Sequence, residues 1–178
     1  MTSVSIASEA GAGAGTEAPP TAQFLTFLLR SDVFAIDIRS VREIIQCGTM
    51  TTVPAMPAFV RGVINLRGAV VPVIDLQARF GRARAALGMK SCIVIFDAIR
   101  GGDRLELGLL VDAVSEVVDI AAPSIEPPPT FGASVRREFI HGVSRAAGHF
   151  VLIVDPDKAL DMDEMAQLCD SAQESAFA

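Results

Sequence analysis

One stretch of the sequence decides the fold, because the chain contains it twice: Phe59-Val-Arg-Gly-Val-Ile-Asn-Leu-Arg-Gly-Ala-Val-Val-Pro-Val-Ile-Asp75 and Phe139-Ile-His-Gly-Val-Ser-Arg-Ala-Ala-Gly-His-Phe-Val-Leu-Ile-Val-Asp155. The offset is 80 residues, and the two versions share the leading Phe, both Gly, two Val and the final Asp. Each version places apolar residues on both sides of a glycine-containing corner, which is typical of paired strands.

A second pair of matching segments lies upstream in the same order. Ile38-Arg-Ser-Val-Arg-Glu-Ile-Ile45 aligns with Val111-Asp-Ala-Val-Ser-Glu-Val-Val118 at an offset of 73 residues, and the seven extra residues fall in a proline-rich loop of the second copy. Chance similarity between apolar strands is the alternative explanation, but two blocks in one order favour duplication. Two copies of a strand-rich unit predict two small β-barrels, since a solenoid needs three or more repeats.

The organisation predicted around the repeat is a mainly β chain of two tandem five-stranded barrels. We expect a disordered tail over 1–21, a first barrel repeat at about 22–85 and a second at about 90–155. A C-terminal helix is expected over about 156–170, followed by a flexible tail at 173–178. Asp75 and Asp155 each stand where a helix cap is wanted.

Composition and charge exclude several classes of protein. The chain is 51% hydrophobic and 20% charged, which suits a packed core, and no apolar run is long enough to span a membrane. Residues 23–156 carry 14 bases and 13 acids, so the body lacks the excess of basic residues that nucleic-acid binding requires. Three widely spaced cysteines argue against a disulfide framework. No secretory signal is visible, so a cytoplasmic location is expected.

Motifs for catalysis or cofactor binding do not occur in the sequence. There is no phosphate-binding glycine loop, zinc-protease helix, nucleophile elbow or kinase signature. His141 and His149 lack a convergent ligand set, so we predict no metal and no cofactor. Asp75 and Asp155 could form an acid–base dyad, but the capping role explains them better.

Differences between the two copies point to candidate binding residues. Arg67 has no counterpart at the second corner, whereas Glu43 does, in Glu116. We infer that Arg67 pairs with Glu43 and orients a surface, although an ordinary turn arginine also fits. Val41 would share a strand face with Glu43 and either contact a partner or enter the core. Phe131, after three prolines, either anchors another protein or pins its own loop.

With these residues in place, the chain resembles the chemotaxis coupling proteins, the CheW-like family, from about Ala22 to Ala172. The matching segments are Phe34-Ala-Ile-Asp-Ile with Val41-Arg-Glu-Ile44, Pro57-Ala-Phe-Val-Arg-Gly62, Asn65-Leu-Arg-Gly-Ala-Val-Val-Pro-Val-Ile-Asp-Leu76, Gly108-Leu-Leu-Val-Asp-Ala-Val-Ser-Glu-Val117 and Phe139-Ile-His-Gly142.

The resemblance implies two five-stranded SH3-like barrels with a terminal helix, in a non-enzymatic adaptor. It implies binding to the cytoplasmic tip of a methyl-accepting chemoreceptor and to the regulatory domain of a CheA-type histidine kinase, with which such adaptors form rings. It places receptor contacts at Val41, Gly62 and Arg67, with Glu43 as the partner of that arginine. Kinase or ring contacts are implied at Ile38 and Phe131.

Three alternatives stay open at this point. The adaptor could serve a chemotaxis-like pathway that controls pili, biofilm signalling or development. The chain could instead be a barrel module that binds nucleic acid, which the nearly neutral body disfavours. It could also be an enzyme with an unfamiliar site. Neither direct membrane insertion nor nucleic-acid binding is expected of the adaptor.

Overall fold

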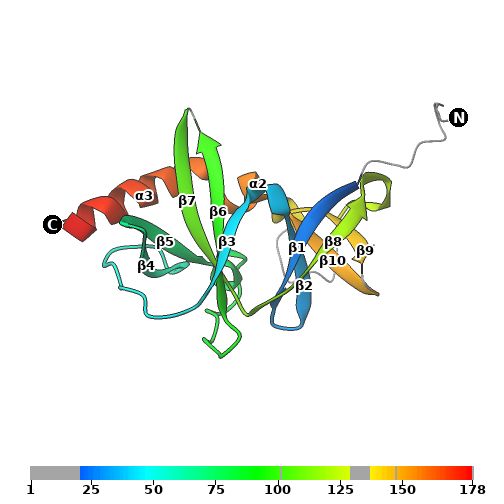
Figure 1. Ribbon diagram of the computed structural model, residues 1–178, viewed down its shortest axis with the longest axis horizontal. Helices are drawn as coiled ribbons and strands as arrows, with labels where there is room; N and C mark the ends of the chain where they lie inside the picture. Colours follow the sequence, from blue (N-terminus) through cyan, green and yellow to red (C-terminus); the bar gives the residue numbers. More distant parts are fainter. Residues whose placement is uncertain (1–20, 101, 129–136, 147, 178) are drawn as a thin grey trace, which may run out of the picture.

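The computed structural model describes residues 21–100, 102–128, 137–146 and 148–177, which form two five-stranded sheets (Figure 1). The first sheet has the strand order β8-β1-β2-β10-β9 and the second has the order β3-β6-β7-β5-β4. The prediction of a mainly β fold with two five-stranded units is confirmed. The strands are β1 (Thr21–Leu29), β2 (Asp32–Asp37), β3 (Val41–Gln46), β4 (Val60–Leu66), β5 (Ala69–Asp75), β6 (Cys92–Arg100), β7 (Asp103–Val111), β8 (Ala113–Ala121), β9 (Ile140–Ala146) and β10 (His149–Val154).

Each sheet is built from both repeats. The first sheet takes the β1–β2 hairpin from the first repeat and β8, β9 and β10 from the second. The second sheet takes β3, β4 and β5 from the first repeat and the β6–β7 hairpin from the second. The sheets therefore do not follow the predicted division at about 22–85 and 90–155. An alignment of repeats identifies equivalent strands, but it does not say which copy each strand pairs with.

The duplication itself is visible in the strand orders. Replacing β8, β1, β2, β10 and β9 by their equivalents β3, β6, β7, β5 and β4 converts one order into the other. In both sheets the exchanged hairpin pairs with the other repeat on both sides. One of these pairings is antiparallel (β1 with β8, β6 with β3) and the other is parallel (β2 with β10, β7 with β5). The matching strand orders support duplication over chance similarity between apolar strands.

An isolated bridge joins the two edges of each sheet. After β3 the chain pairs with β4 through Thr51 and Val63, whose backbone groups exchange hydrogen bonds of 2.9 and 2.8 Å. After β8 it pairs with β9 through Glu126 and Val143, with two bonds of 2.8 Å. Each sheet thus closes on itself, as a barrel does, and the specific likeness to SH3 barrels stays a prediction.

Three apolar clusters hold this arrangement together. One cluster around Ala35 and Val151 lines one face of the first sheet, and a second around Val73 and Ile95 lines one face of the second sheet. The largest cluster takes the opposite faces of both sheets and the helices, and includes Phe34 and Phe80. Because this cluster is shared, the two sheets are packed as one body.

Two equivalent aspartates begin short helices where the strands end. Oδ1 of Asp75 accepts hydrogen bonds from the backbone N–H of Gln77 (3.0 Å) and Ala78 (3.2 Å) at the start of α1 (Leu76–Arg79). Oδ1 of Asp155 accepts one from Asp157 (3.1 Å) at the start of α2 (Pro156–Leu160). The predicted capping roles are confirmed.

The C-terminal helix differs from the expected single helix over about 156–170. It is divided into α2 and α3 (Met162–Phe177), and α3 continues through most of the predicted flexible tail. Asp161 has a left-handed backbone, with φ of +48°, and its Oδ1 accepts a hydrogen bond from the N–H of Glu164 at 3.3 Å. Asp161 thereby starts a new helix, and the Asp-x-x-Glu spacing is its sequence signal. Short 3-10 turns occupy η2 (Ile38–Ser40), η3 (Ala122–Ser124) and η4 (Arg137–Phe139).

Candidate functional site

The predicted pairing of Glu43 with Arg67 is present. Nη2 of Arg67 lies 2.5 Å from Oε1 of Glu43, and the two side chains are 64% and 27% exposed. Glu43 stands on β3, and Arg67 stands in the turn between β4 and β5. Since β3 and β4 are the two edges of the second sheet, the ion pair joins these edges at the surface.

The turn that carries Arg67 has an unusual backbone. Arg67 and Gly68 form a two-residue hairpin loop, with φ of +52° and +86°. Positive φ at both positions is the pattern of a type I′ turn, in which Asn or Asp usually takes the place of arginine. Oδ1 of Asn65 accepts a hydrogen bond from the N–H of Gly68 at 3.1 Å and stabilises the loop. The chain therefore holds an arginine in a strained position, where its guanidinium reaches Glu43.

Val41 was predicted to share a strand face with Glu43, and this prediction is wrong. A β-bulge separates them: Val41 pairs with Phe96 and Glu43 pairs with Ile95, so two residues of β3 span one step of β6. Consecutive residues of β6 face opposite sides, which sends Val41 to the large shared core and Glu43 to the other side of the sheet. Val41 is half-buried, so part of it is still accessible.

Gly62 lies inside β4, and its equivalent Gly142 lies inside β9, so neither is a turn residue. A Cβ atom on Gly62 would stand 2.6 Å from the carbonyl oxygen of Thr51, and one on Gly142 would stand 2.8 Å from that of Glu126. Thr51 and Glu126 are the residues whose bridges close the two sheets. The glycines are needed so that the closing segment can approach.

We expect Gly62→Ala to destabilise the protein by about 2 to 4 kcal/mol, because the methyl group meets backbone and φ is +154°. Gly68→Ala is the matched control, since its φ is also positive but nothing lies within 4 Å of the added Cβ. The control should lose about 1 kcal/mol. Urea unfolding measures both, and equal losses would contradict a steric role for Gly62.

Of the two predicted kinase or ring contacts, Ile38 is among the residues that the structure describes and Phe131 is not. Ile38 begins η2 and is half-buried against the shared core. Its neighbours Asp37 and Arg39 form an ion pair of 2.7 Å, and the side-chain hydrogen bond from Arg39 lowers the pKa of Asp37. Phe131 lies outside the described residues. The structure therefore places Val41, Glu43, Gly62 and Arg67 on or next to β3 and β4, with Val41 on the opposite face from Glu43 and Ile38 in η2, just before β3.

Sequence reasoning missed a network of four charged side chains across β3, β6 and β7. Arg42 lies 3.5 Å from both Asp97 and Glu106, and Nε of Arg104 donates to Asp97 at 2.8 and 3.0 Å. No spacing in the sequence predicts it, since the contacts depend on strand register. The only sequence signal for this network is the alternation of charged and apolar residues along β7, which indicates that the charged residues share one face of the strand.

The cysteines and the possible metal ligands in the described part of the chain are not arranged for thiol chemistry or metal binding. Burial raises the pKa of the Cys169 thiol to about 11, with Asp170 adding to the effect, and burial also raises the pKa of Cys47. Both thiols are therefore poor nucleophiles at neutral pH. Within residues 21–177, apart from the gaps stated above, no three His, Cys, Asp or Glu side chains come together as metal ligands.

None of the helices that the structure describes is both long and apolar enough to cross a bilayer.

Comparisons with known proteins agree on one family. Residues 23–164 match the model of the CheW-like domain. The chemotaxis protein CheW of Klebsiella aerogenes is 33% identical over 144 residues, which cover 81% of this chain and 84% of that protein. Protein FrzA of Myxococcus xanthus is 26% identical over 162 residues, covering 91% of this chain and 94% of its own. The crystal structure of the scaffolding protein TtCheW from Thermoanaerobacter tengcongensis matches with a TM-score of 0.68 at 33% identity, covering 80% of this chain and 90% of that one.

Proposed function

Since the chain belongs to the CheW-like domain family, we propose that it is a non-enzymatic adaptor that couples chemoreceptors to a CheA-type histidine kinase and controls the kinase in chemotaxis. Relatives named as chemotaxis proteins and a solved relative named as a scaffolding protein support this class of function. The observation that carries it is the Glu43–Arg67 ion pair, which holds an exposed guanidinium on a rigid turn.

The receptor contacts of this proposal are Val41, Glu43, Gly62 and Arg67, of which Val41 contributes only its accessible part, on the other side of β3 from Glu43. Arg67 supplies further N–H donors beyond the one that binds Glu43, so it can bind a receptor helix while its own position is fixed. Gly62 acts indirectly, because it lets the closing segment at Thr51 approach β4, the strand that leads into the Arg67 turn. Ile38 and Phe131 are the proposed contacts to the kinase regulatory domain or to neighbours in the ring.

Such an adaptor acts through binding geometry alone. It has no catalytic residue, cofactor or metal, and it inserts into no membrane and binds no nucleic acid in this proposal. By holding receptor and kinase together it lets a receptor conformational change bias the kinase between active and inactive states. Its location is the cytoplasm, at membrane-associated receptor arrays that it reaches through its partners.

The test is reconstitution of kinase autophosphorylation with receptor-containing membranes, with and without this protein. We expect strong activation that requires the protein. Arg67→Ala should raise the concentration needed for half-maximal activation by about tenfold or more, since it removes a contact and leaves Glu43 unpaired.

A closely matched control is Arg30→Ala. Arg30 is also an exposed arginine in a two-residue hairpin turn, with φ of +58°, but it lies between β1 and β2. It should leave activation unchanged. Equal activation by the wild type and the Arg67 variant would contradict the receptor surface, and no activation by the wild type would contradict coupling itself.

A second candidate is a coupling protein of a chemotaxis-like pathway that controls pili, biofilm or development. The match to Protein FrzA favours keeping it, because this relative is not named as a chemotaxis protein yet aligns over 91% of the chain. Deletion of the gene separates the two: loss of directed swimming supports the first, and loss of surface behaviour with normal swimming supports the second.

A further inference from the structure

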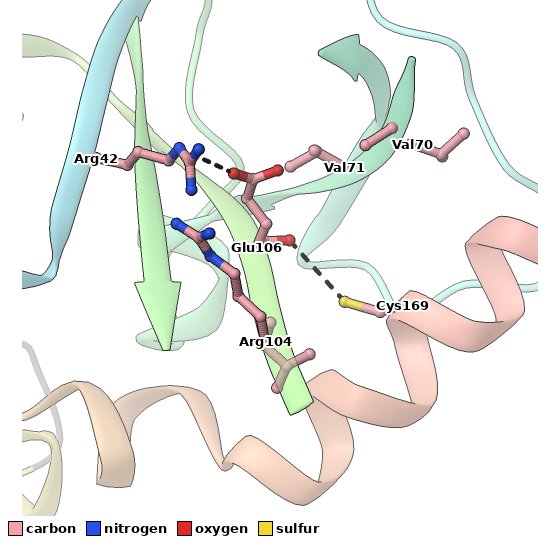
Figure 2. A pocket seen from close by; sticks show the side chains of 8 residues that line it. Arg42, Val70, Val71, Arg104, Glu106 and Cys169 are labelled. Carbon is pink, nitrogen blue, oxygen red and sulfur yellow. Dashed lines mark hydrogen bonds and ion pairs between the residues drawn. The ribbon is translucent and has the colours of Figure 1, made fainter. Parts of the chain in front are cut away.

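A pocket of about 310 Å³ opens on the second sheet, and neither Glu43 nor Arg67 is among the residues that line it. Figure 2 shows that it is framed by β3, β5, β7 and α3, with Arg42 and Glu106 pointing toward one another across its mouth. Val70, Val71 and Cys169 supply apolar walls, and Val71 is only 1% exposed. The pocket thus has apolar walls and, at its mouth, a rim of charged side chains that includes Arg42, Arg104 and Glu106.

The charges of the rim are arranged with the cations outermost. The side chains of Arg42 and Arg104 are 38% and 56% exposed, whereas those of Asp97 and Glu106 are each 23% exposed. The carboxylates therefore lie beneath the guanidinium groups and orient them. An approaching molecule meets the N–H donors of two arginines before it meets either acid.

Arg42 is held more loosely than Arg104. Its contacts with Asp97 and Glu106 are both 3.5 Å, at the outer limit of hydrogen bonding, whereas Arg104 binds Asp97 through two nitrogen atoms. A carboxylate from another molecule could thus bind Arg42 with little loss of existing contacts. Binding would bring a negative charge to the two most exposed members of the network.

The pocket is continuous with the proposed receptor surface. Arg42 precedes Glu43 on β3, and Ala69 and Val70 follow the Arg67–Gly68 turn on β5. Arg42 also contacts Asp97, which lies on the same side of β6 as Ile95, the strand partner of Glu43. One partner element that covers the ion pair can therefore reach the pocket mouth.

We propose that this pocket takes an acidic side chain together with an adjacent apolar side chain from the same partner helix that docks on the Glu43–Arg67 pair. The inference rests on the proposed function, and it adds a second anchor point with a stated chemistry. The acid binds between Arg42 and Arg104, and the apolar side chain lies against Val70 and Val71. Such pairing of an apolar anchor with a charge-assisted contact is common where helices bind grooves.

The test is sedimentation of the full chain with receptor-containing membranes, without kinase, over a range of salt concentrations. The double variant Arg42→Gln, Arg104→Gln should bind about tenfold more weakly and with a flatter salt dependence. Arg39→Gln is the control, because Arg39 also forms an exposed ion pair but lies outside the pocket. Binding equal to that of the wild type, with unchanged salt dependence, would overturn the proposal.

A second readout keeps the arginines in place. In a Cys47→Ser, Cys92→Ser variant, Cys169 reports on the pocket through its rate of reaction with a small methanethiosulfonate, measured at alkaline pH because burial raises the pKa of this thiol to about 11. Saturating receptor membranes should slow this reaction severalfold, and an unchanged rate would contradict occupancy. If Arg67→Ala weakens binding while both pocket tests fail, the adaptor proposal stands and the pocket proposal falls; if the wild type does not bind at all, both fall.

Discussion

Replacing Asp75 with alanine is expected to lower the free energy of unfolding by about 3 to 5 kcal/mol. Asp75 is fully buried, and Nη1 of Arg61 lies 3.0 Å from its Oδ2. The same oxygen accepts a hydrogen bond from the N–H of Ala85 at 2.8 Å, and Arg61 donates to the carbonyl of Ala85 at 2.7 Å. Without the carboxylate, Arg61 is left as a largely buried charge and the segment after α1 loses its attachment.

The repeat supplies the control for this experiment. Asp155 is the equivalent residue, and its carboxylate caps α2 just as that of Asp75 caps α1. The difference is that the position of Arg61 is taken by His141, which is exposed on β9. Asp155→Ala should therefore cost only about 1 kcal/mol, the usual value of a helix cap. Urea unfolding of both variants measures the difference. Equal losses would mean that Asp75 acts only as a cap and that its pairing with Arg61 contributes nothing.

The second large effect is expected at Arg79, which ties the two sheets and the C-terminal helices together. Its guanidinium lies 4.7 Å from the ring centre of Phe59 and 5.9 Å from that of Phe139. Its Nε donates to the carbonyl of Ala159 at 2.7 Å, and its Nη1 lies 3.0 Å from Oε1 of Glu164. Phe59 and Phe139 are repeat equivalents, and so are Arg79 and Ala159, so the arginine stands between the two halves of the duplication.

Arg79→Ala should destabilise the protein by about 2 to 4 kcal/mol, because it removes hydrogen bonds from a mostly buried charge and two ring contacts. Arg145→Ala is the control, since its guanidinium lies at the same 4.7 Å from the Phe150 ring, but this ring is 63% exposed. That variant should lose less than about 1 kcal/mol. Thermal unfolding of both variants gives the comparison; a small loss at Arg79 would show that the shared apolar core alone fixes the sheets.

The repeat made much of the fold predictable. Its two blocks located β3, β4, β5 and their equivalents, and the terminal aspartates located α1 and α2. It could not show the exchange of the β1–β2 and β6–β7 hairpins, because equivalent strands satisfy the same hydrophobic pattern in either copy. That choice is made by tertiary packing over a core that both sheets share.

The candidate site was predictable in the same uneven way. Arg67 stood out because only one copy carries it, and its pairing with Glu43 followed. The face of Val41 was predicted wrongly, since one extra residue in a β-bulge reverses the alternation that the prediction used. The network of Arg42, Asp97, Arg104 and Glu106 depends on which residues of three strands lie opposite one another. Only the register reveals that.

The hairpin exchange also bears on how such a protein could arise. A chain with a single repeat would own a hairpin and a three-stranded piece that belong to different sheets, so it could complete its sheets only by trading hairpins with a second molecule. Joining two copies in one chain replaces that encounter by an effective concentration of about the millimolar range. In the fused chain, the two copies also no longer need to have the same sequence. In a symmetric dimer every corner would change together, whereas in the fused chain one corner could gain Arg67 while the other kept Ala147.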